Sequence, residues 1–184
     1  MKSLTTKRYR LIIPSEVPSE QAIQDLFKIR SNPEIAEVEG IEPFTTHEES
    51  KKLLQRLLRN TQENQSEFWF IYDQQNRCVG VINLWDFDPA RTEAEFGYSV
   101  LPDFQRQGVM SEALVAAEHY AFKDLGLAQL NIYTGATNIP SQGLIKKNHY
   151  QQIRQLTEPN GKGEQTVMIQ FAKTRAAYYR DNNF

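Results

Sequence analysis

The sequence is poor in cysteine, in histidine and in long apolar runs. Its single cysteine, Cys78, cannot form a disulfide within the chain, so we expect a reducing, cytoplasmic location. No apolar run approaches the roughly 20 residues that a membrane-spanning helix needs, so we expect no membrane partner. The histidines, His47, His119 and His149, are scattered without a spacing typical of metal ligands, and we expect no metal site.

A basic excess is also missing. The 21 lysine and arginine residues are balanced by 23 aspartate and glutamate residues, for a net charge of −2. A general nucleic-acid-binding protein usually carries positive charge, so direct nucleic-acid binding is not expected. With 184 residues, 40% of them hydrophobic and 24% charged, the chain suits one globular domain with a substantial core.

Four common catalytic and nucleotide-binding motifs are absent from the sequence. The phosphate-binding G-x-x-x-x-G-K-[ST] loop and the G-x-G-x-x-G dinucleotide fingerprint do not occur. Neither does the H-E-x-x-H pair of zinc proteases, nor the G-x-S-x-G elbow of serine hydrolases. The usual forms of these enzyme classes are therefore not expected, and less common phosphate sites stay open.

Hydrophobic periodicity and turn residues divide the chain into strands and helices. Strands are predicted at residues 7–13, 68–72, 78–85, 93–101, 130–133, 150–155 and 166–171. Helices are predicted at residues 18–32, 46–59, 109–125 and 138–148, the second of them starting at a Thr46–Glu49 capping box. We therefore expect a single α+β domain over residues 1–184, with helices packed on a mixed, mostly antiparallel sheet. The tail from Thr174 receives no assignment.

A strongly acidic stretch, residues 34–49, connects the first two predicted helices. It contains no lysine or arginine, and its glutamates are Glu34, Glu37, Glu39, Glu42, Glu48 and Glu49. Two interpretations are open. The stretch is either a solvated acidic loop or an acceptor surface that attracts a cation through its long-range field.

The strand at 93–101 and the helix at 109–125 are joined by a tight turn, Gln105-Arg106-Gln107-Gly108-Val109-Met110. Such a turn directs unpaired backbone N–H groups and the positive end of a helix dipole at one point, which suits a phosphate. Glu112 lies in the first helical turn, where an acid complements the dipole. Taken alone, the turn is equally consistent with a plain helix start.

Other segments make the turn more specific. A further helix starts at Asn138-Ile139-Pro140-Ser141, directly after another predicted strand. This segment belongs to a set with Lys7-Arg8-Tyr9-Arg10-Leu11, Phe96-Gly97-Tyr98 and Gln107-Gly108-Val109-Met110-Ser111-Glu112-Ala113. Together these segments resemble the GNAT N-acetyltransferase superfamily, in particular its ribosomal-protein N-acetyltransferase (RimJ/RimL-like) branch. The similarity covers residues 7–172, which is nearly the whole chain.

The resemblance implies a GNAT-like three-layer fold with two splayed central strands, whose cleft holds acetyl-CoA as cosubstrate. The CoA pyrophosphate would be bound by backbone N–H groups of Gln105, Arg106, Gln107, Gly108, Val109 and Met110. The pantetheine arm would pair with the backbone of Tyr98, Ser99 and Val100, where an N–H group would also stabilise the oxyanion. Asn138 would hydrogen-bond the pantetheine or the loop beside it, and Ser141 would donate a proton to the departing thiolate, directly or through water.

Three positions depart from the family pattern. Met110 stands where glycine or alanine is usual, which a backbone-mediated site tolerates when the side chain points away. His149 occupies a helix-ending glycine position, where a left-handed histidine is permitted. Ile145 replaces the tyrosine that commonly protonates the thiolate, and this shifts that role toward Ser141.

Amine attack also requires a general base, because a free amine is mostly protonated at neutral pH. Glu95 lies in the central strand, on the same face as Glu93 and Gly97 by period-two alternation. It is either this base or a surface carboxylate. Tyr98 and Trp85 are likewise either pocket walls or core residues.

The sequence therefore predicts an acetyl-CoA-dependent N-acetyltransferase that works by direct attack of an amine, without a covalent enzyme intermediate. The acidic stretch favours a cationic acceptor, such as the N-terminus of a basic protein partner. The alternatives are N-acetylation of an amino sugar, a polyamine or an antibiotic, a non-catalytic acyl-CoA-binding module, and a partner-binding domain that uses the fold as a scaffold. The oligomeric state is left open.

Overall fold

A computed structural model describes residues 1–181 and confirms an α+β fold built on one sheet. Within these residues the sheet has eight strands in the order β1-β2-β3-β4-β5-β6-β8-β7. They are β1 (Leu4–Thr5), β2 (Arg10–Ile12), β3 (Glu67–Tyr72), β4 (Cys78–Trp85), β5 (Glu93–Val100), β6 (Gln129–Gly135), β7 (Gln151–Pro159) and β8 (Gln165–Thr174). Neighbouring strands are antiparallel except β5 and β6, which are parallel, so the sheet is mixed and mostly antiparallel, as predicted.

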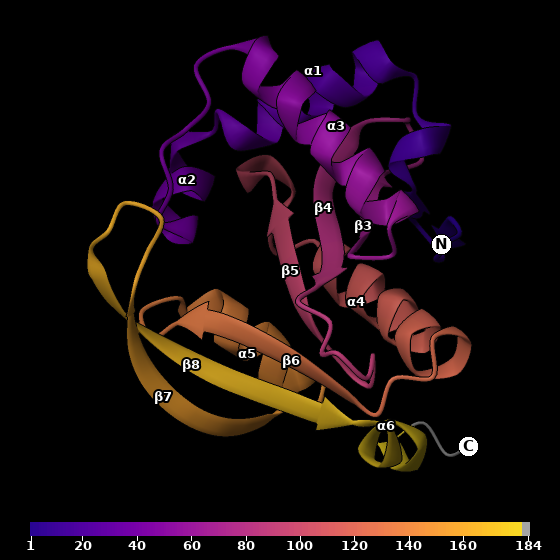
Figure 1. Cartoon of the computed structure of the whole chain (residues 1–184), viewed down its shortest axis with the longest axis vertical. Coiled ribbons are helices and arrows are strands. Elements are labelled where there is room, and N and C mark those ends of the chain that lie inside the picture. Colours follow the sequence, from indigo (N-terminus) through magenta and orange to yellow (C-terminus); the bar gives the residue numbers. More distant parts are fainter. Residues whose placement is uncertain (182–184) are drawn as a thin grey trace.

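Helices flank the sheet on both sides (Figure 1). They are α1 (Ser19–Arg30), α2 (Pro33–Glu39), α3 (His47–Gln62), α4 (Val109–His119), α5 (Ile139–Lys147) and α6 (Arg175–Asp181). Short helical segments at Pro14–Glu16 and Pro102–Phe104, and a π-helical segment at Tyr120–Asp124 that continues α4, complete the described elements. None of the helices in residues 1–181 is long and apolar enough to cross a membrane.

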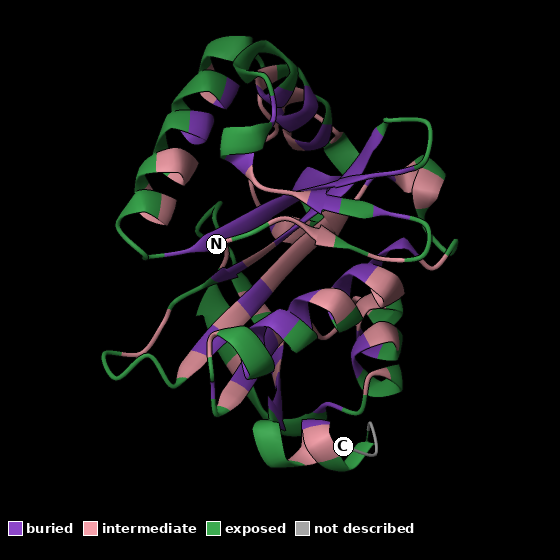
Figure 2. Cartoon of the chain, turned by 90° about the vertical axis from the view of Figure 1, so that its right-hand side faces the viewer, coloured by how far each residue is buried: buried purple, intermediate pink, exposed green. Residues whose placement is uncertain are grey.

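Alternation along β3 divides the core into two clusters, one on each face of the sheet. Phe70 packs with Leu26 of α1 and Leu54 of α3, whereas Trp69 belongs to the cluster that contains Leu114 of α4. Figure 2 shows the buried residues concentrated in the strands and on the inner sides of the helices. Burial of these apolar side chains fixes which face each helix covers.

The acidic stretch is not a plain connection, and this prediction was wrong. Residues Pro33–Glu39 form α2, because the Asn32 side chain accepts hydrogen bonds from the Glu34 and Ile35 N–H groups at 3.0 and 3.1 Å. Pro33 fits the first helical position, and Gly40 ends the helix with a left-handed φ of +64°. Asn32-Pro33 therefore begins a second helix directly after α1 ends.

Other predicted boundaries are partly confirmed. The first strand is shorter than residues 7–13, whereas β7 and β8 extend beyond residues 150–155 and 166–171, because they pair along nearly their whole length. The capping box of Thr46 and Glu49 is present at the start of α3. His149 has a left-handed φ of +64°, as expected. Part of the unassigned tail forms α6, and residues 182–184 lie outside the described part of the chain.

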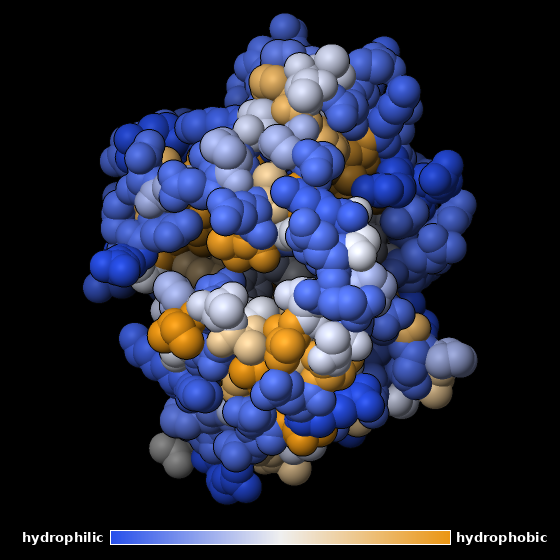
Figure 3. Space-filling model, turned by 90° about the vertical axis from the view of Figure 1, so that its left-hand side faces the viewer, coloured by the Kyte–Doolittle hydropathy of each residue, from blue (hydrophilic) through white to orange (hydrophobic). Residues whose placement is uncertain are grey.

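The turn of the β7–β8 hairpin reaches the end of α2 (Figure 1). A Cβ atom added to Gly40 would lie 2.7 Å from the Asn160 side chain, and one added to Gly161 would lie 3.0 Å from the Gly40 carbonyl oxygen. The two backbones therefore touch. They border a hollow of about 480 Å³ that is lined by Pro33, Ala36, Glu37, Gly40, Pro43, Asn160, Lys162 and Glu164. Figure 3 shows the side of the molecule that carries this hairpin, with a depression near its centre.

Candidate active site

The predicted tight turn is present between β5 and α4. Arg106 and Gly108 have φ values of +58° and +79°, and α4 begins at Val109 with Gly108 as its N-cap residue. Left-handed residues in such a turn bring successive backbone N–H groups to one side, next to the unpaired N–H groups of the helix start. The turn thus has the backbone conformation of an anion site.

The side chains of this turn lie either at the surface or in the core, and the Gln105 N–H already donates to the Pro102 carbonyl at 3.1 Å. Gln105, Arg106 and Gln107 are exposed, while Val109 and Met110 are 2% and 7% exposed and belong to the core under the sheet. Met110 therefore points away from the turn, as the backbone-mediated site requires, although glycine or alanine is usual at this position.

Arg8 is a residue of this site that sequence reasoning missed. An atom at the Cβ position of Gly108 would lie 2.8 Å from Nη2 of Arg8, so the guanidinium lies directly over the turn. The Arg8 Nε donates to Glu112 at 2.5 Å, and the Thr6 hydroxyl donates to the same carboxylate at 2.9 Å. Burial opposes ionisation of Glu112, but the hydrogen bonds from Arg8 and Thr6 outweigh it and lower the pKa of this carboxyl. Glu112 therefore anchors a cation beside the turn, in addition to lying in the first turn of α4.

The two parallel central strands separate beside this turn. β5 and β6 pair only from Glu93–Gln129 to Phe96–Ile132, although β5 continues to Val100 and β6 to Gly135. Tyr98, Ser99 and Val100 stay paired with β4 on their other edge. The edge of β5 that faces β6 therefore borders a V-shaped opening, in which an extended ligand can pair with the strand backbone.

A pair of hydroxyl groups joins the two sides of this opening. The Tyr98 hydroxyl and the Ser141 Oγ are 2.9 Å apart, and Ser141 lies in the first turn of α5, the helix that follows β6. The Asn138 Oδ1 accepts the Ser141 N–H at 3.1 Å and so caps α5. Ile145, which replaces the usual tyrosine, is fully buried in the core and offers no donor to the opening. Sequence reasoning named Tyr98 and Ser141 separately, but no local pattern indicated that they are bonded.

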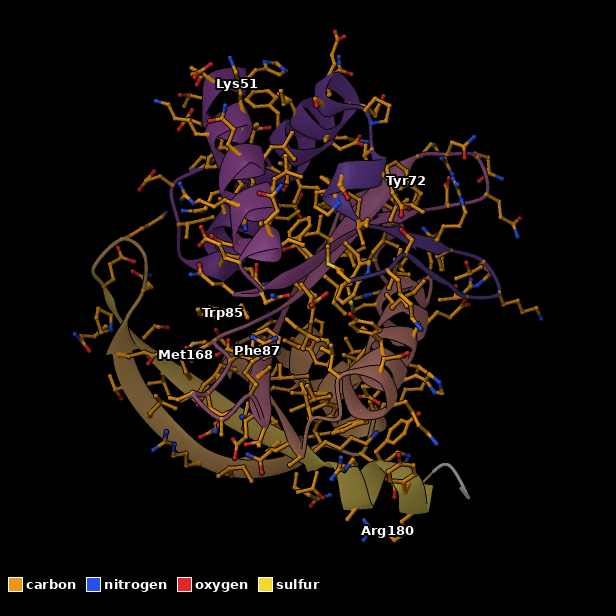
Figure 4. The ribbon with its side chains drawn as sticks, turned by 45° about the vertical axis from the view of Figure 1, so that its right-hand side comes forward. Lys51, Tyr72, Trp85, Phe87, Met168 and Arg180 are labelled. Carbon is orange, nitrogen blue, oxygen red and sulfur yellow. The ribbon has the colours of Figure 1, made fainter. Side chains whose placement is uncertain are left out.

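Glu95 lies on the other face of β5 from Tyr98, in a partly buried position. Burial raises the pKa of Glu95 to about 7, with further contributions from the negative charges of Asp86 and Glu158. Its cross-strand neighbours are Trp85 of β4, which is half-exposed, and Asn131 of β6. Figure 4 shows Trp85 at the end of β4, near the strands of the C-terminal hairpin. A carboxylate with this pKa is half-ionised near neutral pH and can accept a proton there.

The glutamates of residues 34–49 are mostly engaged within the protein. Glu39 binds both Arg30 and the Ser99 hydroxyl, and Glu49 accepts the capping-box hydrogen bonds of α3. Glu42 and Glu48 have lysine partners at 3.9 and 3.8 Å, Lys162 and Lys51. The sequence predicted the capping-box partner of Glu49, but it could not show the Arg30 and Lys162 partners, because only folding brings these cations close to the stretch. Among residues 1–181, no three His, Cys, Asp or Glu side chains are grouped so that they could hold a metal ion.

These features define the class of protein. Two parallel strands separate beside an anion-binding helix start, hydroxyl groups meet at the opening, and a carboxylate with a pKa near neutrality lies on the opposite face of the same strand. A helix start of this conformation suits a phosphate, and a carboxylate with this pKa can accept a proton. The class is that of an acyl-CoA-dependent transferase.

Comparison with known proteins identifies the family. The sequence profile of the acetyltransferase (GNAT) domain matches residues 15–151, and the chain therefore belongs to the GNAT acetyltransferase family, whose members transfer acetyl groups. The chain is 26% identical over 161 residues to YoaA, an uncharacterized N-acetyltransferase of Bacillus subtilis (strain 168). This match covers 85% of this chain and 91% of YoaA.

Solved structures show the same fold. A spermidine N-acetyltransferase from Vibrio cholerae, in complex with CoA and spermine, superposes with a TM-score of 0.79 and 17% identity over 94% of this chain and 99% of that chain. RimL, a ribosomal L7/L12 alpha-N-protein acetyltransferase in complex with CoA, superposes with a TM-score of 0.73 and 22% identity over 94% of this chain and 97% of that chain. Both structures share the GNAT fold of this chain, and one of them is a ribosomal-protein acetyltransferase.

Proposed function

We propose that the protein transfers an acetyl group from acetyl-CoA to a primary amine by direct attack of the amine on the thioester. The observation that carries this proposal is the separation of β5 and β6 next to the Arg106–Gly108 turn and Arg8. Phosphates at the turn and a pantetheine arm along residues 98–100 would place the thioester inside the opening. Two structures with the same fold hold CoA, which supports this cosubstrate.

The residues present suit CoA without help from a metal. The turn offers backbone N–H groups and a guanidinium for the pyrophosphate, and the free edge of β5 offers hydrogen-bonding groups for the amides of the pantetheine arm. A backbone N–H of residues 98–100 would stabilise the oxyanion that forms during attack. Acetyl-CoA supplies the activated acetyl group, and the protein positions it.

Two side chains, one from β5 and one from α5, are proposed to assist the reaction. Glu95 would take the proton from the attacking amine, directly or through water, because its pKa of about 7 leaves it partly ionised where it is needed. Ser141 would face the departing thiolate from the other side of the opening. Glu95 and Tyr98, the partner of Ser141, point to opposite faces of β5, so the amine would enter and the thiolate would leave on different sides.

The acceptor is proposed to be a cationic amine, either a protein N-terminus or a polyamine. The acidic stretch supports this less than its sequence suggested, since Glu39, Glu42, Glu48 and Glu49 are engaged. The support comes instead from the charges of Asp86 and Glu158, which act on Glu95 and make the surroundings of the base negative. Negative potential attracts a cation, and a nearby base with a pKa near 7 converts it into the neutral nucleophile.

A combined binding and turnover assay tests this function. Acetyl-CoA binding is measured by calorimetry, and release of the CoA thiol is followed with panels of N-terminal peptides, polyamines, amino sugars and aminoglycoside antibiotics. Binding with turnover on cationic amines is the expected result. Turnover confined to neutral or anionic acceptors would refute the acceptor class, and binding without any turnover would indicate a non-catalytic acyl-CoA-binding module. Failure to bind any CoA species would indicate a scaffold domain instead.

A further inference from the structure

The hydrogen bond between Tyr98 and Ser141 lies where the two central strands part. Tyr98 is two residues beyond Phe96, the last residue of β5 that pairs with β6, and Ser141 lies in the helix that follows β6. A 2.9 Å contact between their hydroxyl groups therefore spans the opening itself.

Other polar side chains in this part of the chain are already engaged. Asn138 accepts the Ser141 N–H, and Gln142 donates to the Ala136 carbonyl at 2.9 Å. Ile145, one turn along α5, is apolar and fully buried. Ser141 lies in the first turn of α5. Its hydroxyl group contacts the hydroxyl group of another side chain, Tyr98.

The direction of this hydrogen bond follows from the acidity of the two groups. A phenol is a stronger acid than an aliphatic alcohol, so the Tyr98 hydroxyl is the better donor and the Ser141 oxygen the better acceptor. When Tyr98 donates, the Ser141 hydrogen is free to point into the opening. Burial raises the pKa of Tyr98 to about 12, and its hydrogen bond with Ser141 opposes this only in part, so Tyr98 keeps its proton throughout the working pH range.

The same acidity decides what the pair can do for a leaving thiolate. An aliphatic thiol has a pKa of about 8.5, so its thiolate is too weak a base to remove a proton from Tyr98 or from a serine. The pair can nevertheless donate a hydrogen bond to the sulfur. A charge-assisted hydrogen bond of this kind is strongest when the sulfur carries the negative charge that develops as the bond breaks.

We propose that Tyr98 is a positioning residue for acyl transfer: it donates to Ser141 and so holds the Ser141 hydroxyl as a hydrogen-bond donor to the departing CoA thiolate. This inference rests on the proposed function. In the step concerned, the bond between the acyl carbon and sulfur breaks and its electron pair stays on sulfur. The proton of the attacking amine goes to Glu95, and no proton leaves the Tyr98–Ser141 pair. Ser141 is the catalytic residue that contacts sulfur, and its role as a hydrogen-bond donor replaces the role of proton donor predicted from sequence.

The test compares the affinities of CoA and desulfo-CoA, which lacks the thiol, as a function of pH. A bound thiolate that accepts a hydrogen bond has a lowered thiol pKa, and each unit by which it is lowered makes CoA about tenfold tighter relative to desulfo-CoA above the thiol pKa. We expect the affinity ratio of the wild-type protein to rise about tenfold between roughly pH 6.5 and pH 9.5. Other groups that titrate in this range act on both ligands alike and cancel in the ratio.

Two variants and one control locate the effect. Tyr98→Phe is expected to reduce the rise to about threefold or less, and Ser141→Ala to abolish it. Tyr120→Phe is the matched control, because it also removes a buried phenol hydroxyl, one bonded to Glu67 at 3.3 Å away from the opening. It should leave the rise unchanged. Thermal unfolding checks that each variant is folded.

The outcomes separate this inference from the proposed function. If wild-type protein binds CoA but the ratio stays flat, no hydrogen bond to the thiolate exists and the inference fails while CoA binding stands. If Tyr98→Phe keeps the full rise, or weakens both ligands equally, Tyr98 has only a structural role. If neither ligand binds to the wild type, the proposed function fails and this inference fails with it.

Discussion

Replacing Glu95 with glutamine should inactivate the enzyme and stabilise it at the same time. The pKa of Glu95 is raised from an ordinary value of 4.5 to about 7, first by burial and then by the charges of Asp86 and Glu158. Each of these causes disfavours the ionised carboxylate in the folded protein. A neutral glutamine of nearly the same shape removes the charge and keeps the packing.

The magnitude follows from the raised pKa. At about 1.4 kcal/mol for each pKa unit, a rise from 4.5 to about 7 corresponds to about 3 kcal/mol of destabilisation by the ionised group, as an upper limit for a partly buried side chain. Because the pKa is raised on folding, this destabilisation is absent below about pH 4.5, grows between about pH 4.5 and 7, and is complete above about pH 7. For a domain of this size, about 3 kcal/mol corresponds to about 6–12 °C in the unfolding temperature.

Thermal unfolding of wild type and Glu95→Gln at about pH 4.5 and pH 8 measures this effect. The variant should unfold at a similar temperature at the lower pH and at a higher temperature at the upper pH, while its rate of acetyl transfer falls about a hundredfold. Glu93→Gln is the matched control, since Glu93 lies on the same face and accepts hydrogen bonds from Gln129 and Asn131. It should show no such gain at pH 8. A Glu95→Gln variant that is less stable than wild type at pH 8, or fully active, would refute the reasoning.

Three further predictions concern the turn, the hydroxyl pair and the core. Gly108→Asp should weaken acetyl-CoA binding by at least about tenfold in calorimetry, because the carboxylate would repel the phosphates and meet Arg8. Gly163→Asp is the control, because Gly163 also has a positive φ, +81°, but no neighbour within 4 Å of its Cβ position. This variant should strain the backbone in the same way and leave binding unchanged. Ser141→Ala should lower kcat about tenfold with little change in acetyl-CoA affinity, and an equal loss in both would indicate a structural serine. Lys173→Met should lower the free energy of unfolding by about 3–5 kcal/mol in urea titrations, because it leaves the buried Glu118 carboxylate without its 3.1 Å partner. Adding Glu118→Leu should restore much of this loss. Equal stability of the single variant and wild type would contradict the prediction.

Much of the fold could be predicted from the sequence, because its signals are local. The capping box at Thr46, the alternation along residues 93–100 and the glycine before α4 each act through neighbours a few residues away. α2 was missed although its signals are also local. Asn32-Pro33 both stops one helix and starts the next, and only the stop was recognised.

The sequence by itself determined the turn at residues 105–110, the strand that leads into it and the candidate carboxylate on that strand, because period, turn chemistry and motif spacing are properties of short segments. The tertiary structure decided how these parts work together. It placed Arg8, from the connection between β1 and β2, over the turn, bonded Tyr98 to Ser141 across the opening, and raised the pKa of Glu95 through burial and through charges on other elements. These effects depend on distances between residues far apart in the chain and on exclusion of water, and neither is written in any local pattern.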